Sequence, residues 1–287
     1  MAVVSVTPAN VLSAPMADVV VDGVRLAYDV AGEGPPVLLV CGTGQPALMW
    51  DVLMKPDLLA AGYQVITFDN RGIGATPRGA GPLSIETMAG DARAILDAEA
   101  IDRCHVLGHS MGGLIGLALA LDAPARVLSL SMLCTFADGA GPTRPSLRMI
   151  VLGTRSRIGT RAMRQRAMQD MLFTPDWLHG KDRGALAGEL NALFGRDLGV
   201  SAPIVDEQLK VMGRYDATPQ LGRLAGIPTL VVSGRHDPIA PPASGRAIAA
   251  GIGGARYVEF HDAGHALVIQ SADRVNALLR EHLDAVR

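Results

Sequence analysis

The feature that most constrains the fold is a repeated alternation of short apolar runs with stretches of helical character. The apolar runs are continuous rather than alternating with polar residues, which is typical of strands buried on both faces. Strands that alternate with helices predict a parallel sheet covered by helices on both faces. The runs are Pro36–Val40, Tyr63–Phe68, His105–Leu107, Val127–Leu133, Thr229–Val232 and Tyr257–Phe260.

Two further strands are predicted ahead of this alternation. Asp18–Val21 and Val24–Val30 are strand-like, and Asp22-Gly23 between them is a hairpin turn signal. With the six apolar runs they predict an α/β fold with a mostly parallel, eight-stranded sheet.

The alternation stops between residues 139 and 225. No run rich in Val and Ile occurs there, and helical patches follow one another instead. This predicts an all-helical insertion (139–225) within an α/β core (18–138 and 226–287), preceded by a loose leader (1–17). The patches are Leu147–Gly153, Arg161–Met171, Ala185–Phe194 and Ile204–Met212.

Composition excludes several classes of protein. Hydrophobic residues make up 49% of the 287 residues, which favours a packed globule over disorder. A net charge of −2 gives no electrostatic basis for binding nucleic acid. No apolar stretch reaches the roughly 18 residues that span a bilayer, and residues 1–16 lack the pattern of a signal peptide. We therefore expect a cytoplasmic protein with no membrane partner.

The three cysteines, Cys41, Cys104 and Cys134, each lie within an apolar run. An odd number of buried cysteines without a CxxC pair predicts reduced thiols, with neither a disulfide framework nor a metal site.

Gly108-His109-Ser110-Met111-Gly112 matches the G-x-S-x-G nucleophile elbow. A strand precedes it and an apolar helix, Met111–Leu121, follows it. A sharp turn there would hold the Ser110 hydroxyl above the sheet, and small residues two positions away would let neighbouring backbone approach. The alternative is an ordinary turn in which the serine caps the helix, but the flanking strand and helix favour a nucleophile.

A serine hydroxyl needs an adjacent base to act as a nucleophile. Asp237 follows the strand Thr229–Val232, and His265 lies beyond the strand Tyr257–Phe260. A lone Asp or His in a loop is usually a turn residue, but here both follow successive strands in the order nucleophile, acid, base. We predict that His265 is the base and that Asp237 orients it. Asp262 is a poorer acid because it is only three residues from His265.

Two backbone N–H groups are candidates for stabilising an oxyanion. One is that of Met111, directly after the nucleophile, and the other is that of Thr43 in the loop Cys41–Gly44, which follows the first long buried strand. An ordinary glycine turn is the alternative for the second.

These motifs together resemble the α/β-hydrolase superfamily over residues 18–286. The pattern is similar to the capped branch that holds enol-lactonases, carboxylesterases, aclacinomycin methylesterase-like enzymes, C–C bond hydrolases and cofactor-free haloperoxidases. Cys41 departs from it, because the family usually has His-Gly where this chain has Cys41-Gly42. The residues that carry the resemblance are Cys41–Gly44 with Trp50, Asp69–Gly74, the Ser110 elbow, Gly234–Asp237 and Gly264-His265.

The resemblance implies that the insertion is a helical cap over the substrate pocket. Candidate substrate-contacting residues are Trp50, Met149, Met171 and Trp177, although most of the apolar side chains in the insertion are expected to pack it onto the sheet. A basic run in the insertion is expected to be a solvated face, with binding of an anionic group as the alternative. The run consists of Arg144, Arg148, Arg155, Arg157, Arg161, Arg164 and Arg166.

The predicted function is hydrolysis of a carboxylic ester or lactone through an acyl-serine intermediate, without metal or organic cofactor. The expected partner is a small apolar ester or lactone, and a homodimer is left open. Thioester or C–C bond hydrolysis and cofactor-free haloperoxidase or perhydrolase activity are alternatives, since the same three residues serve them. A non-hydrolytic cyclase or binding protein on this fold is a further alternative, but such proteins commonly lack one of the three, and this chain has all of them. Ser110 in place of aspartate argues against dehalogenases and most epoxide hydrolases.

Overall fold

A computed structural model describes residues 16–140, 146–200 and 202–286, apart from the side chain of Arg148. It contains an eight-stranded sheet in the order β1-β2-β4-β3-β5-β6-β7-β8. β1 and β2 pair antiparallel, β2 pairs antiparallel with β4, and the remaining pairs are parallel. The predicted mostly parallel eight-stranded sheet is therefore confirmed. The strands are β1 Ala17–Val21, β2 Val24–Ala31, β3 Pro36–Val40, β4 Gln64–Phe68, β5 Cys104–His109, β6 Val127–Leu133, β7 Thr229–Gly234 and β8 Arg256–Phe260.

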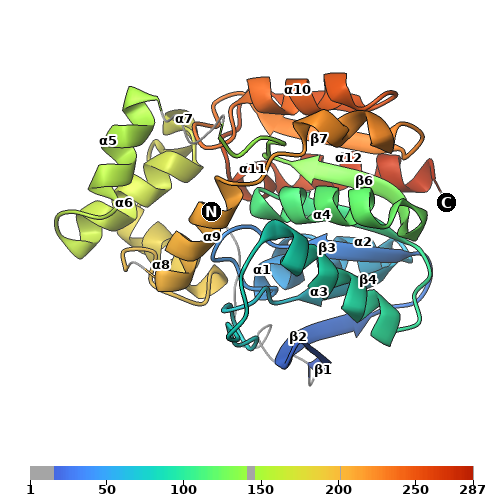
Figure 1. The fold of residues 1–287 in the computed structure, drawn as a ribbon. Coiled ribbons are helices and arrows are strands. Elements are labelled where there is room, and N and C mark those ends of the chain that lie inside the picture. Colours follow the sequence, from blue (N-terminus) through green and yellow to red (C-terminus); the bar gives the residue numbers. More distant parts are fainter. Residues whose placement is uncertain (1–15, 141–145, 201, 287) are drawn as a thin grey trace.

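Continuous apolar strands separate two hydrophobic cores, one on each face of the sheet. In β3 the side chains alternate, so that Leu38 and Val40 enter one core while Val37 and Leu39 enter the other. Helices α3, α4 and α10 cover the first core, and α1, α2, α11 and α12 cover the second (Figure 1). The helices are α1 Leu48–Leu53, α2 Lys55–Ala60, α3 Ile85–Ala98, α4 Met111–Asp122, α10 Pro242–Gly251, α11 Leu267–Gln270 and α12 Ala272–Asp284, with a short 3-10 helix η2 at Pro124–Arg126.

Five helices are inserted between β6 and β7 and lie together at one side of the sheet (Figure 1). We call them the inserted helices. Apolar side chains of α8, such as Leu186 and Leu190, join the same hydrophobic core as α1 and α12, so the insertion is packed onto the sheet. The inserted helices are α5 Leu147–Arg155, α6 Arg161–Leu172, α7 Pro175–Leu178, α8 Arg183–Leu193 and α9 Pro203–Met212; the 3-10 helix η3, Thr218–Leu224, leads back to β7.

Two pairs of consecutive helices, α1 with α2 and α11 with α12, are each separated by a single residue. The stretch from Leu48 to Ala61 divides at Met54, whose φ of −135° is not helical, and Pro56 then occupies the first turn of α2. Ser271, which also has a φ of −135°, separates the short helix α11 from α12. Ser84 caps α3 as its sequence suggests, accepting the Thr87 N–H at 3.0 Å.

In the described part of the chain, no helix combines the length and the apolar character needed to cross a bilayer. All three cysteines are buried and free. Residues 1–15 of the expected leader and Arg144 of the basic run lie outside the described residues.

Candidate active site

Ser110 occupies the turn between β5 and α4 in a strained backbone conformation. Its φ of +56° and ψ of −120° are unusual for a residue with a side chain. A Cβ on Gly108 would lie 2.1 Å from the Gly112 carbonyl oxygen, and a Cβ on Gly112 would lie 2.1 Å from the Val40 carbonyl oxygen. Only glycine fits at these two positions, which explains the spacing of the motif.

Ser110, His265 and Asp237 form a connected set of side chains. The His265 Nε2 lies 3.1 Å from the Ser110 Oγ, and the His265 Nδ1 lies 2.8 Å from an Asp237 carboxylate oxygen. Asp237 follows β7, and His265 lies in the loop after β8. Because the carboxyl ends of parallel strands meet at one edge of a sheet, these distant residues converge there.

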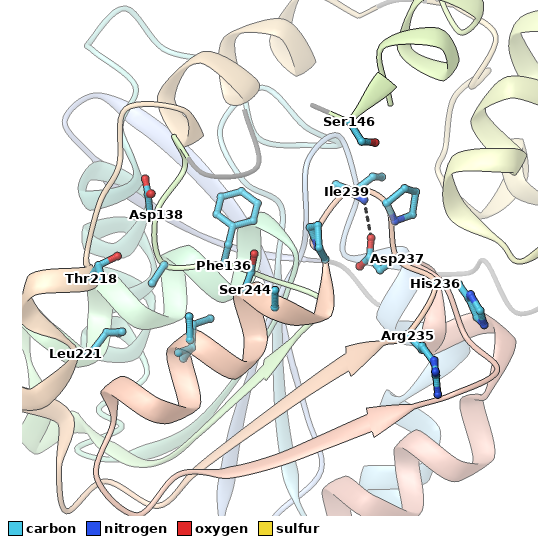
Figure 2. A pocket seen from close by; sticks show the side chains of 16 residues that line it. Phe136, Asp138, Ser146, Thr218, Leu221, Arg235, His236, Asp237, Ile239 and Ser244 are labelled. Atoms are coloured by element: carbon cyan, nitrogen blue, oxygen red, sulfur yellow. Dashed lines mark hydrogen bonds between the residues drawn. The ribbon is translucent and has the colours of Figure 1, made fainter. Parts of the chain in front are cut away.

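The Asp237 carboxylate is held in place from its other side. Its Oδ1 accepts the N–H of Ile239 at 2.8 Å, as Figure 2 shows, and that of Ala240 at 2.9 Å. The Oδ2 is then left to accept the proton on His265 Nδ1, which leaves Nε2 unprotonated and facing the Ser110 hydroxyl. All three side chains are buried in the described structure. The geometry suits proton transfer from Ser110 to His265.

The loop after β3 offers a free N–H group at Thr43. The neighbouring N–H of Gly42 donates to Gln45 Oε1 at 2.8 Å, and that of Gly44 donates to Gln208 Oε1 at 2.9 Å. Among the residues that the structure describes, no acceptor is seen for the N–H of Thr43 or Met111. These two groups therefore remain candidates for an oxyanion site.

Helix α9 ties the inserted helices to this loop. Gln208 is fully buried and binds the Gly44 N–H, and the Thr43 hydroxyl donates to Met212 Sδ at 3.1 Å. The Gln208 amide nitrogen is buried without a partner among the described residues. Sequence alone gives no sign of these contacts, since Gln208 is 164 residues from Gly44.

His109 supports His265, a role that the sequence does not indicate. Its Nε2 donates to the carbonyl oxygen of His265 at 3.0 Å, and the two ring centres are 5.0 Å apart. Burial, together with the nearby His265, lowers the pKa of His109 from 6.5 to about 4, so the ring is neutral near pH 7. A histidine directly before Ser110 thus holds the backbone of His265 in place.

Ser110 and His265 open onto a cavity of about 290 Å³ between the sheet edge and the inserted helices. Of the predicted substrate-contacting residues, Met149 and Met171 line it, and Thr43 does as well. Trp50 is instead fully buried in the core under α1. Trp177 stacks on Phe173 with ring centres 4.3 Å apart, and neither tryptophan is among the residues that line this cavity.

A larger cavity of about 830 Å³ lies on the far side of the Asp237 loop. Figure 2 shows it between that loop, η3 and α10, with Phe136, Thr218 and Ser244 among the side chains around it. Ser110 and His265 are not among its lining residues, so it is separate from the cavity over the nucleophile.

Other sequence candidates lie elsewhere. Asp262, the rejected acid, pairs with Arg274 at 2.6 Å on the surface. Cys41 is buried beside the Thr43 loop, where its thiol donates to the Pro46 carbonyl at 3.3 Å.

The described arginines of the basic run are largely exposed or paired, as a solvated face requires. Arg157 pairs with Asp206 at 2.6 Å, Arg161 pairs with Asp197, and Arg164 donates to the carbonyls of Gly159 and Gly199.

The motif after β4 braces the loops around the site. The Asp69 carboxylate accepts the N–H of Ala47 at 2.8 Å and that of Ala75 at 2.9 Å. Arg71 forms a buried, two-pronged ion pair with Asp91, with both N–O distances at 2.7 Å. These contacts are structural, since neither side chain lines the cavity over Ser110.

One described trio of potential metal ligands lies at the site. Side-chain atoms of His109, Cys134 and His265 lie within 4.8 Å of one another. His265 already uses both ring nitrogens, on Asp237 and Ser110. Burial raises the pKa of Cys134 well above 9.0, so the thiol stays protonated. The trio is therefore poorly suited to bind a metal.

Comparison with known proteins agrees with this architecture. Residues 35–272 match the sequence model of the alpha/beta hydrolase fold family. A protein named as the carbamate hydrolase RutD from Azorhizobium caulinodans is 32% identical over 260 residues, which cover 88% of this chain and 93% of that protein.

Two solved structures extend the comparison. One is a protein named as the non-heme bromoperoxidase BpoC from Mycobacterium tuberculosis, which is 29% identical and superimposes with a TM-score of 0.79 over 91% of this chain and 96% of that one. The other is the enol-lactonase from Burkholderia xenovorans, which is 28% identical with a TM-score of 0.76 over 93% of this chain and 100% of that one. The chain therefore belongs to the α/β-hydrolase family and is an enzyme of that family.

Proposed function

We propose that the protein is a serine hydrolase that cleaves a carboxylic ester or lactone through an acyl-serine intermediate. The observation that carries this proposal is the chain of contacts from Ser110 Oγ through His265 to Asp237, with distances of 3.1 and 2.8 Å. The cavity above Ser110 is mostly apolar and is lined in part by the inserted helices, which would serve as the cap. A small apolar substrate fits these surroundings.

The residues suggest the following sequence of steps. His265 Nε2 takes the proton of Ser110 as Oγ bonds to the carbonyl carbon, and Asp237 stabilises the imidazolium. The negative charge on the former carbonyl oxygen would be met by the N–H groups of Thr43 and Met111. His265 then gives its proton to the leaving alkoxide, and the acyl-serine is formed. Water activated by His265 releases the acid and restores Ser110.

A fluorophosphonate probe tests whether Ser110 is an activated nucleophile. We expect the wild type to be labelled and Ser110→Ala to remain unlabelled. Ser244→Ala is a matched control, because Ser244 lines the separate cavity beyond Asp237 and should leave labelling unchanged. Equal labelling of Ser110→Ala and wild type would refute the proposal.

A second experiment identifies the type of bond that the enzyme cleaves. p-Nitrophenyl esters of graded acyl length and simple lactones should be turned over by the wild type and not by Ser110→Ala. Absence of turnover on both sets by a protein that the probe labels would refute ester and lactone hydrolysis and direct attention to thioesters or C–C bonds.

A further inference from the structure

Arg196, in the loop between α8 and α9, places a guanidinium group at the wall of the cavity over Ser110. Its Nε donates to the Gly44 carbonyl at 3.4 Å and its Nη1 to the Val200 carbonyl at 3.5 Å. Both distances are at the outer limit for a hydrogen bond. Arg196 forms no ion pair with any residue that the structure describes, although it is only partly exposed to water.

The acidic groups next to Arg196 in sequence and on the same cavity wall are committed to other partners. Asp197, its neighbour in sequence, binds Arg161, the side chain of Gln165 and the Gly199 N–H. Asp206 is the carboxylate among the described residues that line the cavity, and it pairs with Arg157 at 2.6 Å. The cavity wall therefore carries one uncompensated positive charge.

An unpaired guanidinium in such a place is costly. Burial lowers the pKa of Arg196, and the neighbouring Asp197 offsets this only in part; the group nevertheless stays charged, as arginine does in proteins. The planar fork of arginine matches a carboxylate with two parallel hydrogen bonds. The rest of the wall is mostly apolar, with Met168, Leu172, Phe194 and Leu198.

We propose that Arg196 binds a carboxylate of the substrate, so that the enzyme acts on esters or lactones that carry a free acid group as well as an apolar body. This specificity rests on the proposed hydrolase function. The cation also lies beside the reactive loop, because Arg196 contacts Gly44, the residue after Thr43. A carboxylate held there would align the scissile carbonyl with Ser110 and the Thr43 N–H.

Matched pairs of esters test this specificity. Monomethyl esters of succinate, glutarate, adipate and pimelate are compared with the methyl esters of the monocarboxylic acids of equal chain length, by titrating the acid released. We expect the wild type to prefer the acidic ester at one or two of these lengths. Arg196→Gln should lower kcat/KM for that ester about 50-fold, mainly through KM, because a buried charge pair is lost. Its activity on the neutral esters should stay within about threefold.

Two further variants serve as controls. Arg157→Gln removes a cation from the same wall that already has its own acid, so the preference for acidic esters should remain. Arg196→Lys keeps the charge without the fork and should recover part of the preference. Thermal melting of each variant shows whether it is folded.

Binding separates this proposal from the proposed hydrolase function. The dicarboxylate of the preferred length is titrated calorimetrically into Ser110→Ala, with and without Arg196→Gln. Loss of binding on adding Arg196→Gln supports the carboxylate site even if no ester is cleaved, which would refute the hydrolase function alone. An unchanged ratio of acidic to neutral ester turnover in Arg196→Gln, with unchanged dicarboxylate binding, would overturn the role of Arg196.

Discussion

The loops at the strand ends and the inserted helices meet at the cavity over Ser110, but they are held in place differently. Backbone hydrogen bonds to neighbouring segments fix the strand-end loops. Examples are the Ser110 N–H to the Leu133 carbonyl at 2.9 Å and the His236 N–H to the Ala263 carbonyl at 3.0 Å.

The inserted helices depend more on side chains. Surface ion pairs such as Arg157–Asp206 and Arg183–Asp170 join them to one another, and such pairs contribute little each. Among the described residues, all exposed large apolar side chains except Val20 lie in the insertion between β6 and β7. These side chains are Leu147, Ile150, Val151, Ile158, Met163, Val200 and Leu209. The difference teaches that backbone contacts at the strand ends fix the positions of Ser110, His265 and Asp237, whereas exchangeable side chains shape the cavity over Ser110.

The largest effect, on kcat, is expected for Asp237→Asn, which replaces one carboxylate oxygen by an NH₂ group. Asn in place of Asp237 can still accept the Ile239 and Ala240 N–H groups through its oxygen, which turns its NH₂ group toward His265. His265 must then carry its proton on Nε2 and cannot accept that of Ser110. We expect kcat to fall about 10,000-fold with little change in the melting temperature.

Asp262→Asn is the matched control for Asp237→Asn, because Asp262 pairs with Arg274 on the surface. Its kcat should stay within about twofold of the wild type. Similar losses of activity in both variants would contradict the assignment of Asp237 as the orienting acid.

Adding one methyl group, by a glycine-to-alanine substitution, should have opposite effects on the free energy of unfolding in the strand-end region and in the inserted helices. In Gly112→Ala the new Cβ would meet the Val40 carbonyl oxygen at 2.1 Å, and the backbone of the sheet cannot move aside easily. We expect a loss of about 3 kcal/mol in the free energy of unfolding. In Gly188→Ala, on the inserted helix α8, the Cβ meets nothing within 4 Å.

Gly188→Ala should gain about 0.5 to 1 kcal/mol, because alanine loses less conformational entropy in a helix. Urea unfolding of the two variants measures both changes. Equal destabilisation by the two substitutions would show that the two regions do not differ as we describe.

The parts of the site that the sequence predicted depend on local signals. Gly108 and Gly112 indicate the turn at Ser110, because close backbone contacts require glycine at both positions. Asp237 and His265 could be predicted because each follows a strand. The sheet itself is visible in the continuous apolar runs for the same reason: burial on both faces acts on each strand separately.

The parts that the sequence missed depend on contacts between distant segments. Gln208 meets Gly44, and Arg196 lies on the cavity wall without an ion-pair partner among the described residues, unlike Arg157 and Arg161 of the basic run. Trp50 was expected among the substrate-contacting residues, but α1 turns it fully into the core. Burial of this kind follows from tertiary packing, and no pattern near Trp50 reveals it.

A pH-dependent effect concerns His109, which lies wholly within the strand-end region. Its pKa in the folded protein is lowered by burial to about 4, from 6.5. Between these values the unfolded chain binds the proton more tightly, so His109 costs no stability above about pH 6.5 and destabilises the fold progressively as the pH falls toward 4. From pH 7.5 to 4.5 this loss is on the order of 2 kcal/mol. His109→Gln removes this pH-dependent loss. When the pH falls from 7.5 to 4.5, the unfolding free energy of the variant should therefore decrease less than that of the wild type, by that amount. Parallel pH curves for the two proteins would mean that this ring is not shielded from water as the packing against His265 implies.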